Sequence, residues 1–290
     1  MRVVRTKHEL RTLLSAPRRE GRTIGLVPTM GALHEGHLSL LRAARKRCDV
    51  VVMSLFVNPS QFGPAEDFAS YPRDEQADVA RAEDEGVDIV YAPDGGEVYP
   101  AGFATAVEVG GGLTDVLCGD PSQRGPEHFR GVVTVVAKLL NTVGPDVAFF
   151  GQKDAQQATV IRRMARDLDF PAEIMVLPTV REPDGLAMSS RNAYLDADAR
   201  ERATALSRAL RAAERAASSG GAVAPALDAA HAELRAAGIE PEYLEARDAA
   251  SLERAESFNG RPVLVAVAAR VGGARLIDNV VIGADGAGSP

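Results

Sequence analysis

The sequence has only two cysteines and no long hydrophobic run. Cys48 and Cys118 cannot build a disulfide framework, and they fit a reducing compartment. No apolar stretch approaches the ~18 residues that a membrane-spanning helix requires. Residues 1–14 alternate charged with apolar side chains, unlike the core of a secretion signal. We therefore expect a cytoplasmic protein that makes no membrane contact.

The sequence also lacks the common glycine motifs that bind phosphate. Neither G-x-G-x-x-G nor G-x-x-x-x-G-K occurs, which argues against the dinucleotide-binding and P-loop classes. No H-E-x-x-H helix is present to indicate a zinc hydrolase. The net charge of −7 argues against a nucleic-acid partner, since such a surface requires a basic patch.

What the chain does contain is an alternation of strand and helix patterns. At 290 residues, with 46% hydrophobic and 25% charged residues, it has room for one large or two moderate domains. Strands are predicted at residues 23–27, 50–56, 89–92, 147–150 and 172–177, and helices at 38–47, 74–85, 132–143 and 154–168. Because strands that alternate with helices form βαβ units, residues 1–179 are expected to form a Rossmann-like domain with a parallel sheet.

The pattern changes after residue 179. Helices are predicted at 198–217 and 225–237, and strands at 241–247, 263–271 and 274–282. A flexible break is expected at 218–221 and a disordered tail at 283–290. Residues 180–290 are therefore predicted to form a smaller α+β lid domain, which can close over a site and exclude water.

A short motif between an apolar run and a helical pattern is the first candidate for a functional site. It consists of Met30, Gly31, Ala32, Leu33, His34, Glu35, Gly36 and His37. A helix N-terminus attracts phosphate through unpaired N–H groups and its dipole, and imidazoles there can stabilise charge that builds on phosphorus. Zinc ligation and simple helix capping are the alternatives, although zinc needs three or four ligands.

A second motif lies far downstream and carries Met188, Ser189, Ser190 and Arg191. Two hydroxyls beside a guanidinium provide short donors next to a planar, permanently charged group that pairs with phosphate. Alone, this stretch is typical of a solvated loop. Together with the histidine motif, it resembles the paired HxGH and KMSKS-type loops of nucleotidyltransferases, with Arg191 in place of a lysine.

A third candidate follows the apolar run at 147–150 and consists of Gly151, Gln152, Lys153 and Asp154. The chain has four lysines and many arginines, so a lysine at the end of a strand favours a compact ammonium group on a phosphate. Strand ends are where open α/β sheets bind ligands. The alternative is a solvated lysine that pairs with an acidic neighbour.

Taken together, these segments resemble the pantoate–β-alanine ligase (pantothenate synthetase) family of the HxGH nucleotidyltransferase superfamily. The similarity runs from Val27 to Asn279 and is carried by residues 28–37, 56–62, 71–73, 128–132, 150–157 and 188–192. The Asn-Pro-x-Gln-Phe and Lys-Asp-x-Gln-Gln segments distinguish this family from other HxGH enzymes.

The resemblance implies that ATP drives the condensation of pantoate with β-alanine, giving pantothenate, AMP and pyrophosphate through a pantoyl adenylate. It implies that the ATP site comprises residues 30–37 and 151–154, Val180 and residues 188–191. Gln61 and Gln157 would bind pantoate or β-alanine, with Asn58 supporting the same pocket. The catalytic residues implied are His34, His37, Lys153, Ser189, Ser190 and Arg191, with His37 as the usual proton donor.

Three departures from the family pattern leave details open. The segment from Arg124 to Phe129 is one residue longer, so either Arg124 or Arg130 could reach substrate. Asp78 is kept but stands beside Ala77, which leaves any protein ligand to Mg²⁺ unknown and favours metal held by ATP phosphates and water. A glutamate that is common before the lysine is replaced by Gln152, which removes one negative charge near the phosphates.

The resemblance also implies the partners of the chain. It implies a homodimer, and ATP as a substrate with Mg²⁺ without a tightly bound organic cofactor. Two other classes of function compete with this interpretation. A nucleotidyltransferase that acts on another small acid or alcohol would have no use for the amide pair Gln61 and Gln157. A nucleotide-sensing protein without catalysis would not need His37, Lys153 and Arg191 together.

Overall fold

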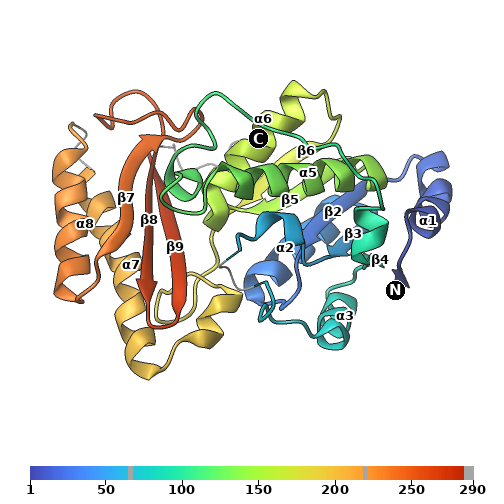
Figure 1. Cartoon of the computed structure of the whole chain (residues 1–290), viewed down its shortest axis with the longest axis horizontal. Coiled ribbons are helices and arrows are strands. Elements are labelled where there is room, and N and C mark those ends of the chain that lie inside the picture. The colour runs from blue at the N-terminus through green and yellow to red at the C-terminus, as the bar shows by residue number, and fades with distance from the viewer. Residues whose placement is uncertain (65–67, 218–220, 284–290) are drawn as a thin grey trace.

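The computed structural model describes residues 1–64, 68–217 and 221–283, and it contains two separate sheets (Figure 1). The larger sheet has six parallel strands, and the smaller sheet has three antiparallel strands. This mixed α/β arrangement confirms the predicted fold class. Within the described ranges, no helix is long and apolar enough to cross a membrane.

The larger sheet and its helices come from the first part of the chain. In chain order the elements are β1 (Arg2–Val4), α1 (Lys7–Arg19), β2 (Ile24–Thr29), α2 (Glu35–Arg47), β3 (Val50–Leu55), the 3-10 helix η1 (Pro59–Gln61), α3 (Glu75–Asp84), β4 (Ile89–Tyr91), α4 (Gly95–Val98), η2 (Leu117–Gly119), α5 (Pro126–Val143), β5 (Val147–Gly151), η3 (Gln152–Asp154), α6 (Ala155–Asp167) and β6 (Glu173–Leu177). Helices α1, α5 and α6 pack on one face of the sheet, and α2 and α3 pack on the other. Strands covered on both faces are read in the sequence as continuous apolar runs.

The order of the strands determines where a ligand can bind. The sheet runs β1-β4-β3-β2-β5-β6, so the chain builds outward from β2 in one direction and then continues from β5 in the other. In a parallel sheet, a crevice opens outside the carboxyl ends of the strands at such a switch point. The histidine motif follows β2 and the lysine segment follows β5, so the topology brings them to the same crevice.

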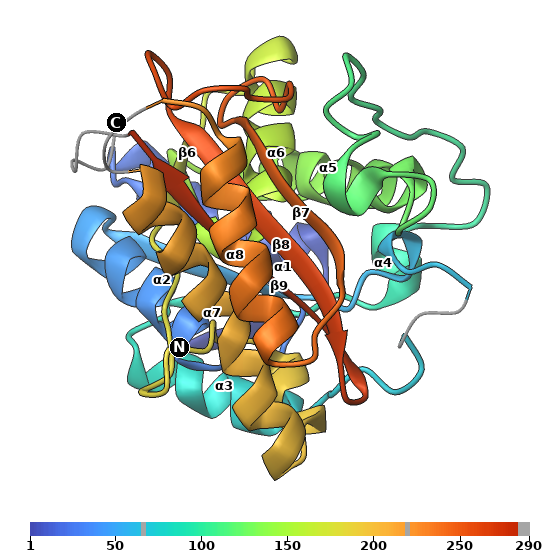
Figure 2. The same cartoon turned by 90° about the vertical axis from the view of Figure 1, so that its left-hand side faces the viewer.

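We call the larger sheet with its helices the first unit, and the smaller sheet with its helices the second unit. Its elements are η4 (Ser190–Tyr194), α7 (Ala197–Ala217), α8 (Ala224–Ala236), β7 (Pro241–Asp248), β8 (Val263–Val271) and β9 (Ala274–Ile282). Figure 2 shows α7 and α8 lying across one face of this sheet. The other face contacts the first unit. Val265 of β8 packs in a cluster with α7 and α8, whereas its neighbour Leu264 points to the opposite face and packs in the cluster of the first unit.

Most predicted elements are confirmed, with shifts at their ends. The chain also has a strand and helix at its start, β1 and α1, which the sequence analysis did not assign. A capping box of Thr6 and Glu9 marks the beginning of α1 and was the missed signal. Helix α5 begins at Pro126 instead of residue 132, and α2 begins at Glu35, which places His37 in its first turn. Residues 218–220 and 284–290, where a break and a tail were expected, lie outside the described residues.

Candidate active site

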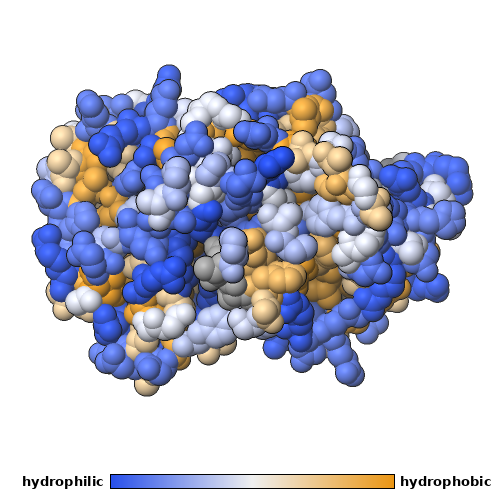
Figure 3. Space-filling model, viewed as in Figure 1, coloured by the Kyte–Doolittle hydropathy of each residue, from blue (hydrophilic) through white to orange (hydrophobic). Residues whose placement is uncertain are grey.

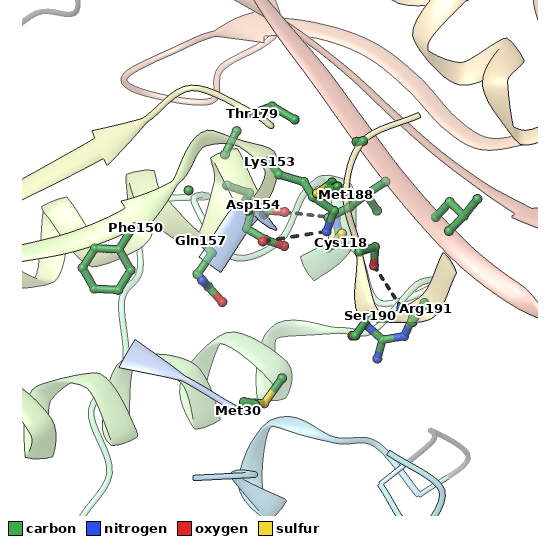
Figure 4. Close-up of a pocket in the computed structure, with 18 of the residues that line it drawn as sticks. Met30, Cys118, Phe150, Lys153, Asp154, Gln157, Thr179, Met188, Ser190 and Arg191 are labelled. Carbon is green, nitrogen blue, oxygen red and sulfur yellow. Dashed lines mark hydrogen bonds and ion pairs between the residues drawn. The ribbon is translucent and has the colours of Figure 1, made fainter. Parts of the chain in front are cut away.

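A cavity of about 800 Å³ opens where the carboxyl ends of β2 and β5 face the second unit. Figure 3 shows a mostly hydrophilic surface, with hydrophobic residues gathered near the middle and at one edge of this face. In the close-up of Figure 4, Lys153 and Asp154 lie side by side near Met188, and Ser190 and Arg191 come from the second unit. Polar groups from three distant segments thus share one cavity.

The structure brings most of the predicted site residues to this cavity. Those that line it are Met30, His34, Gly36, His37, Asn58, Gln61, Gly151, Lys153, Asp154, Gln157, Val180, Met188, Ser189, Ser190 and Arg191. Gly31, Ala32, Leu33, Glu35 and Gln152 do not line it. The carboxylate of Glu35, for example, pairs with Arg42 on the outer side of α2.

His34 and His37 lie at the N-terminus of α2. His34 is the N-cap residue, and its Nδ1 accepts the N–H of Gly36 at 3.1 Å. The Nδ1 of His37 accepts the N–H of His34 at 3.3 Å, and the two ring centres are 4.1 Å apart. Because both Nδ1 atoms accept, each neutral ring carries its proton on Nε2. The motif therefore presents two N–H donors on adjacent rings, which are tilted by 35° to each other.

Both imidazoles are neutral at physiological pH. Burial, followed by the positive charge of Lys153, lowers the pKa of His34 to about 4. Burial, followed by the charges of His34 and Lys153, lowers the pKa of His37 to about 3. In the free protein, the pair thus offers hydrogen-bond donors to an anion, while the positive charge nearby belongs to Lys153.

Gly36 is required by the shape of the motif. A Cβ atom on this residue would lie 2.9 Å from Cε1 and Nδ1 of His34, closer than a side chain can approach. The absence of a side chain allows the ring of His34 to fold back over the first turn of α2. The glycine between the two histidines is therefore explained by packing within the motif.

The loop that precedes α2 is held in place from α3. Asp78, only 3% exposed, accepts the N–H groups of Ala32 at 2.9 Å and Leu33 at 2.8 Å. Arg81, one turn further along α3, donates to the carbonyl of Leu33. Ala32 has a φ of 51°, which is unusual for a residue with a side chain, and these bonds stabilise it. Both oxygens of Asp78 are therefore engaged with the loop, so its place in this structure is that of a support.

The lysine segment forms η3, directly after β5. The Nζ of Lys153 lies 3.9 Å from Oδ2 of Asp154, and a dashed line in Figure 4 marks this ion pair. The Lys153 side chain is 21% exposed and lines the cavity, and its charge lowers the pKa of both histidines. The lysine does pair with an acidic neighbour, but it lies inside the cavity beside the histidines rather than on an open loop.

The second motif begins η4. Ser189 is its N-cap, with Oγ accepting the N–H of Arg191 at 3.3 Å. Ser190 and Arg191 both approach Tyr71 of the first unit. The hydroxyls of Ser190 and Tyr71 are 3.4 Å apart, and the Arg191 guanidinium lies 6.0 Å from the centre of the Tyr71 ring. These contacts bring the Ser-Ser-Arg segment to the cavity from the side opposite β5.

A short hairpin supports the second motif from behind. The N–H of Met188 donates to the carbonyl of Val180 at 3.0 Å, and Arg181 pairs with Ala187 across the turn. Arg181 also forms two bonds with the carboxylate of Asp278 on β9, at 2.6 and 3.0 Å. Two parallel bonds between a guanidinium and a carboxylate fix both groups in one plane.

At the other end of the cavity, Gln61 is held by Asn58. The Nδ2 of Asn58, a residue 1% exposed, donates to Oε1 of Gln61 at 3.2 Å and to the carbonyl of Gly131 at 3.1 Å. Its Oδ1 accepts the hydroxyl of Tyr99 at 2.7 Å. Gly131 allows this approach, because a Cβ there would lie 2.1 Å from a carbonyl oxygen of η1. The polar atoms of Asn58 are thus occupied by the protein and orient Gln61.

Gln157 projects into the cavity from α6, on the side where Met30 lies (Figure 4). Within the described ranges, its amide has no hydrogen-bond partner, so it is available to a ligand. Apolar residues of α5, among them Phe129, Val132 and Val136, line the same cavity. An amide next to an apolar wall suits a small ligand that has both hydroxyl and methyl groups.

The structure also distinguishes the two arginines that the sequence left open. Arg124 lines the cavity, and its Nη1 lies 3.1 Å from Nε2 of His128. The other nitrogen of His128 is 2.7 Å from the carbonyl oxygen of Gln61. Arg130 does not line the cavity and pairs with a glutamate on the exposed side of α5. Of these two arginines, Arg124 is therefore the one that lies at the cavity.

Two hydroxyl groups in the cavity were missed by the sequence analysis. Ser54 Oγ and Thr179 Oγ1 are buried without a hydrogen-bond partner among the described residues, and both residues line the cavity. An unpaired buried hydroxyl is costly, so such groups suit a site where a ligand completes the bonding. Ser54 could have been noticed in the sequence, since it interrupts an apolar strand.

The described residues do not form a separate metal centre. No group of three or more His, Cys, Asp or Glu side chains among them could hold a metal ion. A Mg²⁺ ion that enters with ATP can be held by phosphate oxygens and water, with few protein ligands.

The parallel sheet, with the second unit facing its switch point, defines an α/β protein. The donors in the cavity are suited to a phosphate compound beside a small polar ligand. The family model described as pantoate-beta-alanine ligase matches residues 2–281. The chain therefore belongs to the pantoate–β-alanine ligase family, and it is a ligase.

Individual relatives are similar over nearly their whole length. A pantothenate synthetase of Moorella thermoacetica is 54% identical over 284 residues, covering 97% of this chain and 99% of that protein. The crystal structure of pantothenate synthetase from Thermus thermophilus is 48% identical with a TM-score of 0.91, covering 97% of this chain and 99% of that one. The crystal structure of pantoate-beta-alanine ligase from Francisella tularensis, complexed with beta-gamma ATP and beta-alanine, is 31% identical with a TM-score of 0.80, covering 97% of each chain.

Proposed function

We propose that the protein condenses pantoate with β-alanine at the expense of ATP, through a pantoyl adenylate, to give pantothenate, AMP and pyrophosphate. The observation that carries this proposal is the composition of a single cavity. Donors suited to phosphate, from His34, His37 and Lys153, face the same space as the available amide of Gln157. The Francisella relative, which was solved with an ATP compound and β-alanine, supports the choice of ligands.

The chemistry takes two balanced steps. In the first, a carboxylate oxygen of pantoate attacks the α-phosphorus of ATP, and the bond to the β-phosphate oxygen breaks to release pyrophosphate. In the second, the amine of β-alanine attacks the acyl carbon, loses a proton and displaces AMP. No side chain needs to act as a nucleophile, so catalysis depends on positioning and on stabilising negative charge.

Each half of the phosphate site has a role in the first step. The Nε2–H groups of His34 and His37 donate to the α-phosphate as its charge increases, and Lys153 adds the positive charge. Ser189, Ser190 and Arg191 hold the leaving pyrophosphate from the other side of the cavity. We infer that His37 acts as a hydrogen-bond donor, since its low pKa keeps the ring neutral in the free protein.

The remaining residues bind the rest of the two substrates. Gln61 and Gln157 hold the carboxylate and hydroxyls of pantoate, and Asn58 acts through Gln61. The adenosine end lies against Gly151, Asp154 and Val180, with Asp154 accepting from a ribose hydroxyl. Mg²⁺ accompanies ATP and would shield charge between the phosphates. The chain acts as two domains, residues 1–179 and 180–290, that close on the substrates. The homodimer and the cytoplasmic location stay predictions.

The test is to incubate the protein with MgATP, pantoate and labelled pyrophosphate. Label should enter ATP only when pantoate is present, and β-alanine should then release AMP and pantothenate. Formation of ADP, or exchange driven by β-alanine alone, would overturn the proposed reaction. Isolation of the acyl adenylate from a reaction without β-alanine provides the direct check.

A further inference from the structure

Asn279 lies on β9 of the second unit, but its side chain bonds to the first unit. Its Nδ2 donates to the carbonyl of Gln152 at 3.0 Å and to the carbonyl of Lys153 at 2.9 Å. Its Oδ1 accepts Nε2 of Gln152 at 3.0 Å. The residue is only 5% exposed, so these three bonds are shielded from water.

The two carbonyls that Asn279 binds belong to the peptide groups on either side of Lys153. Fixing both peptide planes fixes the backbone angles of Lys153 and therefore the direction of its Cα–Cβ bond. The segment has no side-chain cap of its own, because neither Gly151 before η3 nor Asp154 before α6 forms one. Asn279 thus supplies a support for the lysine that η3 does not provide.

The neighbouring residue on β9 supports the other half of the phosphate site. Adjacent residues in a strand point to opposite faces of the sheet, so Asp278 faces the helices of the second unit while Asn279 faces β5. Asp278, 3% exposed, holds Arg181 through two bonds, and Arg181 also donates to the carbonyl of Gly185 at 3.2 Å. That turn leads directly to Met188 and the Ser-Ser-Arg segment.

We propose that Asn279 is a positioning residue that aims Lys153 at the phosphates, and that Asp278 and Asn279 together keep the lysine segment in register with the Ser-Ser-Arg segment. This inference rests on the role proposed above for Lys153 in adenylate formation. It assigns a function in the first step to a strand of the second unit that is distant from Lys153 in the sequence.

The first experiment compares two substitutions of Asn279 in pantoate-dependent pyrophosphate exchange. Asn279→Asp keeps the shape of the side chain but turns a carboxylate oxygen toward two carbonyl oxygens. Asn279→Asp should lower kcat about 10²-fold and change the KM for ATP less than about 3-fold. The loss in kcat should be at least as large as that of Asn279→Ala. Near-normal kcat in Asn279→Asp would overturn the proposal, because a residue that only fills space tolerates an isosteric change.

Matched controls separate positioning from charge and from folding. Asn259→Asp makes the same change on an exposed part of the second unit that does not line the cavity, and it should leave kcat unchanged. Gln152→Ala removes one of the three bonds and should give an intermediate loss. Melting temperatures show which variants are folded, and Asn279→Ala supplies the same test if Asn279→Asp does not fold.

The second experiment asks whether Asn279 acts through Lys153. Asn279→Ala should lower exchange strongly in the wild-type background but less than about 3-fold in a Lys153→Ala background, because the aimed group is already gone. In a Ser190→Ala background, Asn279→Ala should keep most of its effect. A full effect in the Lys153→Ala background would overturn the proposal.

Failure of this inference can be distinguished from failure of the proposed function. If the wild-type protein shows no pantoate-dependent exchange, the proposed reaction is wrong. If the wild type exchanges, Lys153→Ala is impaired and Asn279→Asp is normal, only the positioning role of Asn279 is wrong.

Discussion

The two halves of the phosphate site are held in different ways. His34 and His37 are fixed by bonds within the first turn of α2, and the loop before them is fixed by two short bonds from Asp78. Ser190 and Arg191 approach Tyr71 of the first unit through longer contacts, at 3.4 and 6.0 Å. The first half is thus fixed by bonds within one unit, and we call it the rigid half, whereas the second half reaches the cavity across the boundary between the two units.

The base of the second half is nevertheless firmly anchored. Asn192 donates to Glu182 at 2.8 Å, and Arg200 of α7 pairs with the same carboxylate. A segment that is anchored in one unit and contacts the other can close on a ligand when the units move, while donors fixed within one unit are suited to stabilising a transition state. We therefore expect substitutions in the first half to act mainly on kcat and those in the second half to act mainly on ATP binding.

The largest effect is expected in the rigid half. His34→Ala, His37→Ala and Lys153→Ala should each slow adenylate formation by about 10²–10³-fold, the scale for losing one preorganised donor. Their hydrogen bonds tighten as charge develops, so the loss falls on the transition state more than on bound ATP. Single-turnover measurement of acyl adenylate formation checks this, with circular dichroism to confirm folding.

A suitable control for these variants is His8→Ala, on the exposed surface of α1. It should retain full activity. Near-normal adenylation in His37→Ala, or loss of activity only through unfolding, would mean that the histidine motif is structural and that the contrast between the two halves is wrong.

A smaller effect is expected at the substrate end of the cavity. Gln157→Ala should raise the KM for pantoate by about 10–100-fold while the KM for ATP stays nearly constant, because the lost hydrogen bonds leave polar substrate groups unpaired. Gln61→Ala should raise the KM for pantoate in the same way. Asn58→Ala should also raise it, because Gln61 then loses the hydrogen bond that orients its side chain. Steady-state kinetics with each substrate varied in turn measure both KM values. An equal rise in the KM for ATP would mean that these residues do not bind pantoate specifically.

The second half should show a still smaller effect, and on a different constant. Arg191→Ala should raise the KM for ATP by about 10-fold and lower kcat less, because the second half is expected to bind phosphate and not to stabilise the charge that develops at the α-phosphorus. Arg191→Lys should recover part of the loss as a point charge without the planar fork. A loss in kcat as large as that of His37→Ala would remove the distinction between the halves.

The sequence could indicate which segments meet in this cavity, because each of these segments is short. The histidine motif, the lysine segment and the Ser-Ser-Arg segment each follow a predicted element, and parallel topology places strand ends together. The supporting residues were harder to find, since Asp78 and Asn279 act on backbone groups far away in the sequence. No local sequence pattern predicts a hydrogen bond to a backbone group so far away in the chain.

Some features of the site depend on the folded structure and could not be predicted from the sequence. The neutral state of His34 and His37 follows from burial and from the nearby charge of Lys153, neither of which a sequence shows. The choice of Arg124 over Arg130 depends on which face of α5 and its preceding turn meets the cavity. In contrast, α1 could have been predicted from its capping box, although Pro17 inside the helix and its high charge obscured the pattern.

The smallest effect concerns stability and follows from the neutral histidines. Their pKa values are lowered to about 4 and about 3 in the native protein, compared with about 6.5 in an unfolded chain. Between about pH 7 and pH 5, the unfolded chain therefore binds more protons than the native protein, and the free energy of unfolding falls as the pH falls. Each ring should contribute on the order of 1 kcal/mol over this range, a value reduced for partial exposure.

Chemical denaturation at a series of pH values measures this effect. His37→Gln should flatten the dependence of the unfolding free energy on pH, because the unfolded chain then has one fewer group to protonate in this range. His8→Gln, on the exposed face of α1, should keep the wild-type slope. Saturating ATP should weaken the wild-type dependence, since phosphate beside the rings favours their protonated form and raises their pKa in the complex. A slope that His37→Gln leaves unchanged would mean that the ring is not buried as a neutral donor, and the rigid half would lose its defining feature.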